Sequence, residues 1–418
     1  MDSRGDNGVL LREDGRWIIE RAIRAVMPDA AVERALGGRT FSGRVFLVAV
    51  GKAAWQMANT AWGCLGEKID AGIVVTKYGH VKGPIPKIIC YEGGHPVPDD
   101  NSFLGTQAAL DLVQGLRAED TVLFLLSGGG SALFEKPLIS RGELQDITDR
   151  LLACGADIVE INILRKRLSA VKGGRFAQLC APAKVFSVVL SDILGDPLDM
   201  IASGPAWPDR STCEQANAIL EKYGLPVSEQ ARALLNVETP KQLNNVEAVI
   251  TGSVRELCSA AAGACRQRGY ETVFLTDQLN CEAREAGAFL ASIARSYAGC
   301  GRRMAFVAGG ETVVHVTGKG KGGRNQELAL SAAAGIQGLD GVMVCSVGSD
   351  GTDGPTDAAG GMVDGYTAGL LAEKRISIYR ALADNDAYHA LEQANGLIKT
   401  GPTGTNVNDV AIVLIGAD

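Results

Sequence analysis

The sequence predicts an α/β protein built from two domains. Its 418 residues are enough for two or three domains that each bury a core. Between Val45 and Ile415, short apolar runs repeatedly end in glycine turns and lead into helical segments, the pattern of sheets covered by helices. The 52 glycines and only 5% aromatic residues suit the tight turns of such a fold. A polar, proline-bearing stretch at 238–241 interrupts the series, so we expect domains at residues 1–240 and 241–418.

Composition argues against several classes of protein. The 41 basic and 48 acidic residues give a net charge of −7, which disfavours nucleic acid as a partner but not an anionic substrate. Ten cysteines are scattered without a Cys-x-x-Cys pair, so we expect reduced thiols rather than a disulfide framework. The stretch Met1–Asp14 is polar, and no apolar run reaches membrane-spanning length. These features predict a soluble, cytoplasmic protein with no nucleic acid and no membrane among its partners.

The first elements predict a doubly wound domain. Residues 15–36 carry apolar side chains at helical spacing and are expected to form an amphipathic helix that packs against a later domain. The apolar run 45–50 is typical of a buried strand, and it ends at Lys52 before a helical stretch. A dinucleotide site is not predicted, because G-x-G-x-x-G is absent and the next strand, 72–77, ends in a lysine where NAD binding needs an acid. Lys52 is instead placed to meet a phosphate or carboxylate, with a solvated turn lysine as the alternative.

Two loops of this half carry candidate binding groups. Loop 93–102 is rich in glycine and proline, and its last residues can cap the helix that follows. His95 in this loop is a candidate acid, base or phosphate contact, with loop scaffolding as the alternative. After the apolar run 121–126, three glycines stand between two serines and open toward a helix, which predicts a phosphate nest. A plain turn would explain one glycine but not three. The predicted nest consists of Ser127, Gly128, Gly129, Gly130 and Ser131.

Basic and acidic candidates follow in the same half. Lys172 again joins a cation to glycines before a helical stretch, and we expect it to bind substrate or nucleotide. Asp192 closely follows the apolar strand 185–190, at the strand end where ligand sites of α/β proteins lie. It is a candidate metal ligand or general base, and capping of the next turn is the alternative.

The stretch 306–361 gathers the charged groups of the second half. Arg324 and Asn325 follow a run of glycines and lysines at a predicted helix start, where free N–H groups and the helix dipole favour anions. Glu311 and Asp350 follow apolar strands, and carboxylates there suit a hydrated Mg²⁺ that also contacts phosphate. An anion site and cation ligands in one neighbourhood indicate phosphoryl transfer.

A last loop and two absences complete the pattern. Thr405 and Asn406 lie on the glycine loop 401–409, whose hydroxyl and amide groups can contact phosphate, ribose or substrate, with a plain turn as the alternative. Serine hydrolysis is disfavoured because G-x-S-x-G is missing and the chain has only four histidines. Zinc chemistry is disfavoured because the sequence lacks Cys/His ligand spacing.

Several of these motifs resemble those of class II glycerate kinases, over almost the whole chain after the first helical stretch. In the first half the resemblance is carried by residues 50–54, 93–99, 126–132, 172–175, 191–192 and 201–205. In the second half the MOFRL-type part of the family is similar to residues 309–312, 322–327, 348–354 and 400–409. The segment 385–389 departs from the family pattern, which concerns only contacts near that segment.

The resemblance implies an ATP-dependent kinase that phosphorylates the 2-hydroxyl of D-glycerate to give 2-phosphoglycerate. It also implies a Rossmann-like domain and a second α/β domain with a mixed sheet, with the active site in the cleft between them and Lys52 and Arg324 as catalytic residues. Members also carry the label hydroxypyruvate reductase, so an NAD(P)H-dependent reductase of hydroxypyruvate or tartronate semialdehyde is the alternative. The missing dinucleotide fingerprint argues against it. A non-catalytic binding protein for an anionic metabolite is a third hypothesis, and a homodimer is left open.

Our hypothesis for the mechanism assigns roles by charge. Lys52 and Arg324 neutralise the transferring phosphoryl group. The nest holds phosphate oxygens of nucleotide or substrate through its backbone N–H groups. Asp192, Glu311 and Asp350 are candidates for Mg²⁺ binding and for accepting the proton of the attacking hydroxyl, and the sequence does not divide these roles among them.

Overall fold

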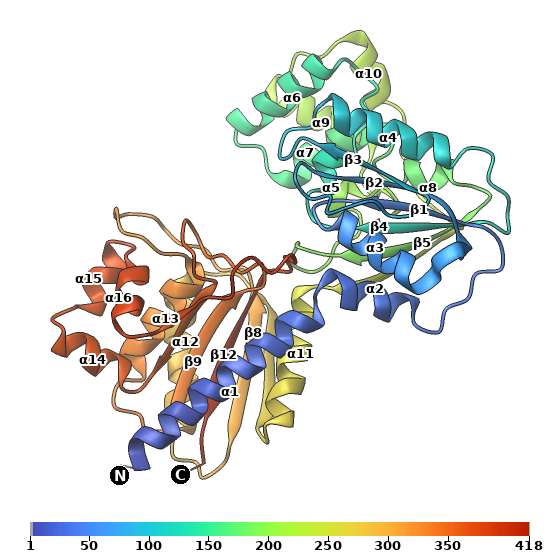
Figure 1. The fold of residues 1–418 in the computed structure, drawn as a ribbon. Helices are drawn as coiled ribbons and strands as arrows, with labels where there is room; N and C mark the ends of the chain where they lie inside the picture. Colours follow the sequence, from blue (N-terminus) through green and yellow to red (C-terminus); the bar gives the residue numbers. More distant parts are fainter. Residues whose placement is uncertain (1–2, 418) are drawn as a thin grey trace. The chain divides into compact units, whose positions relative to one another are not determined.

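The computed structural model describes residues 3–417, which form two compact units. The N-terminal unit comprises Ala31–Ser191 and Asp196–Thr251. The C-terminal unit comprises the chain up to Ala30, the short segment Asp192–Gly195 and the chain from Gly252 onward. Each unit contains its own sheet with helices packed on it, so the predicted α/β class is confirmed (Figure 1).

The N-terminal unit is built on a six-stranded sheet in the order β3-β2-β1-β4-β5-β6. Strands β1 to β5 pair in parallel, and the strand order is the one found in dinucleotide-binding folds. Every residue of β1 and β4 is buried, because helices cover both faces and such strands need apolar side chains throughout. The strands are β1 (Val45–Val50), β2 (Ile69–Lys77), β3 (Ile88–Gly93), β4 (Thr121–Leu126), β5 (Lys184–Leu190) and β6 (Val246–Gly252).

Helices cover both faces of this sheet. On one face lie α2 (Pro28–Leu36) and α3 (Ala54–Leu65). On the other lie α4 (Asp100–Leu112), α5 (Gly130–Leu133) and α8 (Arg175–Leu179). Asp99 caps α4 by accepting a hydrogen bond from the N–H of Ser102 at 2.9 Å, as the sequence predicts. A separate apolar cluster joins α6 (Arg141–Ala153), α7 (Ile158–Arg167), α9 (Cys213–Tyr223) and α10 (Glu229–Leu235), and short turns lie at η1 (Gly66–Lys68) and η2 (Ile201–Ser203).

The C-terminal unit has a six-stranded sheet in the order β11-β10-β9-β12-β8-β7. Within this sheet β7 and β8 pair in parallel and the other described pairs are antiparallel, so the sheet is mixed. The strands are β7 (Glu271–Leu279), β8 (Met304–Gly310), β9 (Val342–Gly348), β10 (Gly360–Asp364), β11 (Leu397–Ile398) and β12 (Asp409–Ile415).

Two groups of helices sandwich this second sheet. On one face α1 (Ser3–Ala25) and α11 (Val254–Gln267) share an apolar core (Figure 1). The other face is covered by α12 (Ala283–Tyr297), α13 (Arg324–Gly335), α14 (Thr367–Glu373), α15 (Ile378–Ala383) and α16 (Ala387–Gln393). Across the described chain, the helices are all too short or too polar to cross a membrane.

The predicted helix at 15–36 is two helices that pack on different sheets. α1 ends at Ala25 and α2 begins at Pro28, because the residue before a proline avoids helical geometry. α1 packs in the C-terminal unit, as expected for a first helix that meets a later domain. α2 packs against the N-terminal sheet instead.

The first strand after the predicted boundary belongs to the first sheet. Ala248–Ile250 is part of β6, next to β5. The stretch 238–241 before it is anchored rather than a linker, because the buried Thr239 donates a hydrogen bond to Asp209 at 2.8 Å. The two units therefore separate at Gly252 rather than at the predicted residue 240.

Candidate active site

The predicted nest lies between β4 and α5 of the N-terminal unit. Ser127 anchors it: its N–H donates to Val50 O at 2.9 Å, and its Oγ accepts from Ala53 N at 3.1 Å. Gly129 adopts a φ of +86°, in the left-handed region that favours glycine. Within residues 3–417, the backbone N–H groups of residues 128–131 find no hydrogen-bond acceptor. The loop therefore presents a row of open donors, as an anion nest requires.

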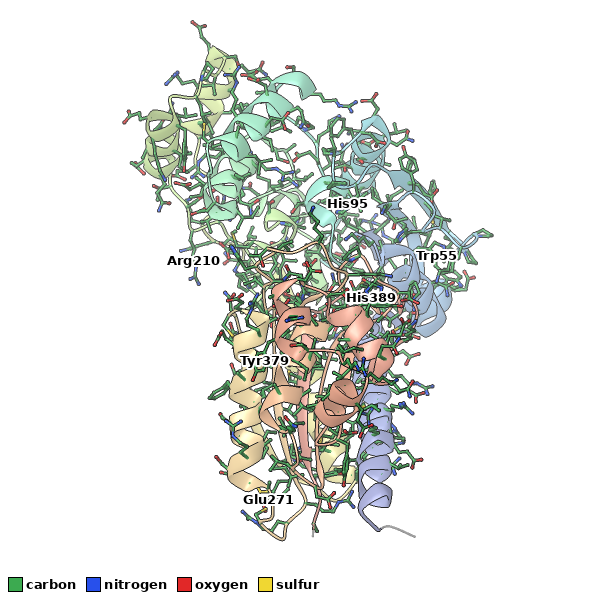
Figure 2. All side chains as sticks on the ribbon, turned by 90° about the vertical axis from the view of Figure 1, so that its left-hand side faces the viewer. Trp55, His95, Arg210, Glu271, Tyr379 and His389 are labelled. Carbon is green, nitrogen blue, oxygen red and sulfur yellow. The ribbon has the colours of Figure 1, made fainter. Side chains whose placement is uncertain are left out.

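Lys52 and His95 stand beside the nest. The N–H of Lys52 donates to Gly128 O at 2.9 Å. A Cβ placed on Gly129 would lie 3.0 Å from His95 Cδ2 and 3.2 Å from Lys52 Cγ, so both side chains contact the loop. His95 belongs to the N-terminal unit (Figure 2). Its burial and the charge of Lys52 lower the pKa of His95, which favours a neutral imidazole with one donor and one acceptor.

Lys172 supports the nest from its buried side. Its side chain is fully buried, and Nζ donates to the carbonyls of Ser131 at 2.8 Å and Phe134 at 3.0 Å. Glu135 lies 3.4 Å from the ammonium, and Arg165 also donates to Ser131 O, at 3.1 Å. Burial lowers the pKa of Lys172 to about 8 even though the Glu135 carboxylate acts to raise it. The sequence predicts Lys172 as a direct binding residue, but its donors are already engaged by the loop.

Arg324 is held in a fixed orientation in the C-terminal unit. It is the first residue of α13, and it grips Asp409 of β12 through two hydrogen bonds, of 2.5 Å from Nε and 3.1 Å from Nη2. Nη1 donates to Glu311 at 3.2 Å. Burial acts to lower the pKa of Arg324, but the hydrogen bonds and charge of Asp409 outweigh it and raise the pKa. The guanidinium is therefore a permanent positive charge with a set direction.

The start of α13 is already occupied by a carboxylate of the chain. Asp353 accepts hydrogen bonds from Asn325 N at 3.1 Å and Gln326 N at 2.8 Å. Burial raises the pKa of Asp353 to about 6. The side chain of Asn325 is also turned inward, where its Oδ1 accepts from the hydroxyl of Ser346 at 2.6 Å. Asp353 thus takes two of the backbone donors at this helix start, whereas the N–H groups of Gly323 and Arg324 meet no acceptor among the described residues.

The N–H groups of residues 317–321, at the start of the glycine and lysine run before α13, are also occupied by acceptors of the chain. The N–H groups of Thr317 and Gly318 both donate to Asn385 Oδ1 at 2.8 Å. Those of the next three residues, 319–321, donate to Asp384 and Asp386. The prediction of backbone donors for an anion therefore narrows to Gly322, Gly323 and Arg324, whose N–H groups meet no acceptor among the described residues.

A pocket of about 660 Å³ adjoins Arg324, and we call it the Arg324 pocket. Its wall includes two of the predicted metal ligands, Glu311 and Asp350. The described residues contain no group of three or more His, Cys, Asp or Glu side chains that could hold a metal ion alone. Two carboxylates on one pocket wall nevertheless fit Mg²⁺, which commonly takes one or two protein oxygens and completes its shell with water and phosphate.

The remaining predicted residues lie outside these two groups. Asp192 belongs to the segment Asp192–Gly195 and is absent from the wall of the Arg324 pocket. Thr405 is buried and its hydroxyl donates to Val26 O at 2.9 Å, so it ties its loop to the end of α1. Asn406 is exposed and accepts a hydrogen bond from Asn408 N at 3.3 Å.

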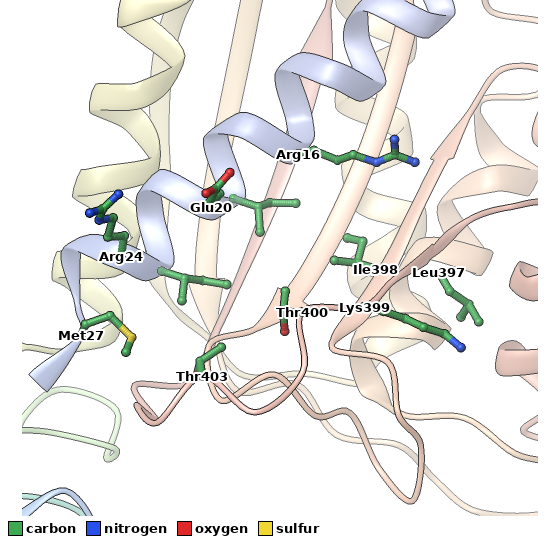
Figure 3. Close-up of a pocket in the computed structure, with 11 residues that line it drawn as sticks. Arg16, Glu20, Arg24, Met27, Leu397, Ile398, Lys399, Thr400 and Thr403 are labelled. Atoms are coloured by element: carbon green, nitrogen blue, oxygen red, sulfur yellow. The ribbon is translucent and has the colours of Figure 1, made fainter. Parts of the chain in front are cut away.

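A second pocket, of about 740 Å³, lies between α1 and residues 397–403 (Figure 3). Ile19, Ile23 and Ile398 give it apolar walls. Lys399 lies at its edge but is engaged elsewhere, since its Nζ donates to Asp357 at 2.8 Å. None of the predicted site residues lines it, so we assign it no step of a reaction.

Two structurally important residues were not predicted as site residues. Asp409 was noted only as part of a loop motif, and Asp353 only as part of the segment after a strand. Each acts on a residue far away in the chain, since Asp409 binds Arg324 and Asp353 binds the N–H of Asn325. An isolated acid near a strand end is the only signal the sequence offers for either.

Comparison with known proteins gives the family. Residues 14–236 match a domain of unknown function, DUF4147, and residues 304–409 match the MOFRL family. The chain is 54% identical to D-glycerate 2-kinase of Thermotoga maritima over 95% of this chain and 97% of that protein. The chain belongs to the glycerate 2-kinase family. A second relative, glycerate 2-kinase of Pyrococcus horikoshii, is 41% identical over 97% of each chain. A crystal structure of the Thermotoga maritima glycerate kinase superposes with a TM-score of 0.94 and covers 97% of this chain and 99% of that one.

The predicted site residues of this glycerate 2-kinase fall in both matched regions. Lys52, His95 and the nest lie in the first matched region. Arg324, Glu311 and Asp350 lie in the second.

Proposed function

We propose that this chain is an ATP-dependent kinase that transfers the γ-phosphoryl group of ATP to the 2-hydroxyl of D-glycerate, giving 2-phosphoglycerate and ADP. The relationship to D-glycerate 2-kinase over nearly the whole chain carries the proposal. The geometry supports it, because an open backbone nest and a permanently charged arginine are the parts that phosphoryl transfer needs.

In the proposed mechanism the two cationic side chains act on one substrate complex. Lys52 and Arg324 neutralise negative charge on the transferring phosphoryl group, and Asp409 keeps the guanidinium aimed. The open N–H groups at residues 128–131 bind anionic oxygens, and the neutral His95 beside them offers a further hydrogen bond. Lys172 and Arg165 fix the nest by donating to Ser131 O.

The proton of the attacking 2-hydroxyl must reach a base. Asp192 follows β5, at the strand end where ligand sites of α/β proteins lie, and is our candidate acceptor. Glu311 and Asp350 would hold Mg²⁺. When bound, the ion would neutralise charge on the phosphate chain.

An ADP-release assay with MgATP and a panel of small 2-hydroxy acids tests the proposal. We expect turnover with D-glycerate, and nuclear magnetic resonance of the product should place the phosphate on the second carbon. A phosphate on the third carbon would refute the proposed regiochemistry. ADP release that does not depend on any hydroxy acid would refute the kinase assignment.

The alternative reductase makes a different prediction. It requires oxidation of NADH or NADPH when hydroxypyruvate or tartronate semialdehyde is added. We expect no such oxidation, because the turn at Gly51–Lys52 lacks the dinucleotide fingerprint.

We also propose a cytoplasmic location, where ATP is plentiful and the ten cysteines would stay reduced. A homodimer remains a prediction that light scattering on the purified chain would test.

A further inference from the structure

We propose that the Arg324 pocket binds the nucleoside end of ATP, so that the C-terminal unit is the nucleotide-binding unit. This inference rests on the proposed kinase function and assigns one substrate to one named pocket. The sequence had left open whether the nest serves the nucleotide or the smaller substrate.

The size of the pocket favours the nucleotide. Its volume of about 660 Å³ falls in the range of pockets that enclose ligands as large as a nucleotide. D-glycerate has three carbons and would leave most of this space to water. Of the two substrates of the proposed reaction, only ATP has a body that fills it.

One wall of the pocket is apolar, and its side chains are exposed. Val313 and Val316, which both line it, are 55% and 73% exposed, and Val314 and Pro355 line it beside them. Exposed apolar side chains grouped in a concave site are typical of ligand contact. The flat face of a purine base is a partner of matching chemistry.

Backbone hydrogen bonds hold this wall in place. Val313 N donates to Cys281 O at 3.0 Å, and Val313 O accepts from Ala283 N at 2.8 Å. The run that follows is fastened by the hydrogen bonds of Thr317–Lys321 to residues 384–386. Gly318 has no space for a side chain, since a Cβ there would lie 2.2 Å from Asp384 O. A preformed wall needs no ordering when the base binds, which favours affinity.

Polar groups complete the match with a nucleotide. Arg324, Glu311 and Asp350 line the same pocket and suit a phosphate chain with its metal ion. Asn280 is exposed, also lines the pocket and has no hydrogen-bond partner among the described residues. Its amide offers both a donor and an acceptor to ribose or base. Asp353 uses the N–H groups of Asn325 and Gln326. The pocket-lining residues 322–324 have N–H groups that meet no acceptor among the described residues and can bind the phosphate chain.

Photolabelling of the full chain tests this assignment. The probes are 2-azido-ATP and 8-azido-ATP with Mg²⁺, and the labelled peptides are found by mass spectrometry. We expect label within residues 311–324 or 350–355, removed by excess ATP. ATP-protected label at residues 93–102 or 127–134 would overturn the inference, and so would failure of both probes to label the pocket.

A pair of matched variants gives a second test. Val316→Glu places a charge on the exposed wall, and we expect the KM for ATP to rise about tenfold or more while the KM for D-glycerate stays within twofold. Val237→Glu is the control, because Val237 is 53% exposed and lies in the other unit. Equal KM values for ATP in the two variants would overturn the inference.

The labelling result and the assigned reaction can fail separately. Label in the pocket without phosphorylation of D-glycerate would keep the nucleotide site and refute the proposed function. Phosphorylation of D-glycerate with label only in the N-terminal unit would keep the function and refute the nucleotide site.

Discussion

Two glycine-rich segments precede helices in this chain, the nest at Ser127–Ser131 and the run at Gly318–Gly323. In the nest, the N–H groups of residues 128–131 meet no acceptor among the described residues. In the run, five successive N–H groups, from Thr317 to Lys321, donate to residues 384–386. The two segments look alike as sequence, but the second keeps open donors only at its end, at Gly322 and Gly323.

The difference shows what makes a glycine loop an anion site. Glycine lets the backbone turn, but a carboxylate or amide from elsewhere in the fold decides whether the donors remain free. Residues 384–386 occupy the first donors of the second segment, and the side chain of Arg324 adds a charge to the few donors that remain open. The first segment relies on its backbone. Variants in each region should therefore lose function for different reasons.

Removal of the Arg324 guanidinium should have the largest effect. Because backbone N–H groups carry only partial charge, Arg324→Ala leaves the phosphoryl group without its full cationic partner in this unit, and we expect kcat to fall about 10³-fold or more. Steady-state kinetics with D-glycerate and MgATP measure it. The variant also leaves Asp409 buried without its partner, so the melting temperature should fall as well.

The control for this loss of stability is Arg12→Ala. Arg12 forms an ion pair with Asp364 at 2.5 Å in the same unit, the same distance as between Arg324 Nε and Asp409. We expect Arg12→Ala to lower the melting temperature but to keep kcat within a few-fold of the parent. A similar fall of kcat in both variants would mean that Arg324 acts only on stability.

Crowding of the nest should have the next largest effect. Gly129→Ala puts a Cβ 3.0 Å from His95 Cδ2 and 3.2 Å from Lys52 Cγ, so the open donors and both side chains must shift. We expect kcat/KM for D-glycerate to fall about 100-fold, because small displacements of positioning groups are costly in catalysis.

Gly115→Ala separates crowding from backbone strain. Gly115 has a φ of +67°, close to the +86° of Gly129, but a Cβ there would meet no atom within 4 Å. Both variants should lose about 1 kcal/mol of stability from the left-handed backbone. Only Gly129→Ala should lose activity, and equal activity in the two would count against an open nest.

The sequence predicted the parts of this comparison that depend on local order along the chain. Apolar runs followed by glycine turns predicted β1, β4 and β9. Lys52 and the nest were predicted because they come directly after such strands. The sequence could not show that Lys172 is buried, or that Asp353 reaches the start of α13 from 28 residues away. Those facts depend on tertiary contacts, which local composition does not encode. The division at 240 failed for the same reason, since one buried hydroxyl of Thr239 anchors that loop.

The buried support of the nest gives a third, pH-dependent prediction. Lys172 has a pKa of about 8, below its ordinary 10.5, so the folded chain loses this proton first. Between about pH 8 and 10.5 the unfolded state binds more protons, and this group's contribution to folding stability therefore rises with pH. Activity should fall over the same range, because the neutral amine no longer pairs with Glu135 or holds Ser131 firmly. Urea unfolding and rate profiles between pH 7 and 10 should show these opposite trends.

The double variant Lys172→Met/Glu135→Gln tests the cause. Lys172→Met alone leaves the buried Glu135 with only the more distant Arg165, at 3.8 Å, as a cationic partner, at a cost of about 3 kcal/mol, which the second substitution should largely remove. Arg165 keeps one hydrogen bond to Ser131 in all these variants. We expect the double variant to fold, to turn over about tenfold more slowly and to lack the alkaline fall in rate. An unchanged alkaline fall would show that another group titrates.

Substitution of Asp353, the carboxylate that caps α13, should have the smallest effect, and we expect that effect on folding stability. Burial raises the pKa of Asp353 from 3.8 to about 6, so between these values the folded state binds more protons than the unfolded state. Stability from this group therefore falls as pH rises through that window. Asp353→Asn removes the titration and one cap acceptor, so we expect a change of about 1 kcal/mol at pH 7.5 and a flatter dependence on pH between 4.5 and 6.5.

The comparison with Asp99, the cap of α4, sharpens this test. Burial acts to raise the pKa of Asp99, but hydrogen bonds from Tyr78 and Ser102 outweigh it and lower the pKa to about 2. The stability that Asp99 contributes is complete above its ordinary pKa and is lost only as pH falls toward 2. Asp99→Asn should therefore leave the slope between pH 4.5 and 6.5 unchanged, as urea unfolding can show. If both variants flattened that slope equally, burial of Asp353 would not be its source, and the assignment of that slope to the buried cap of α13 would have to be abandoned.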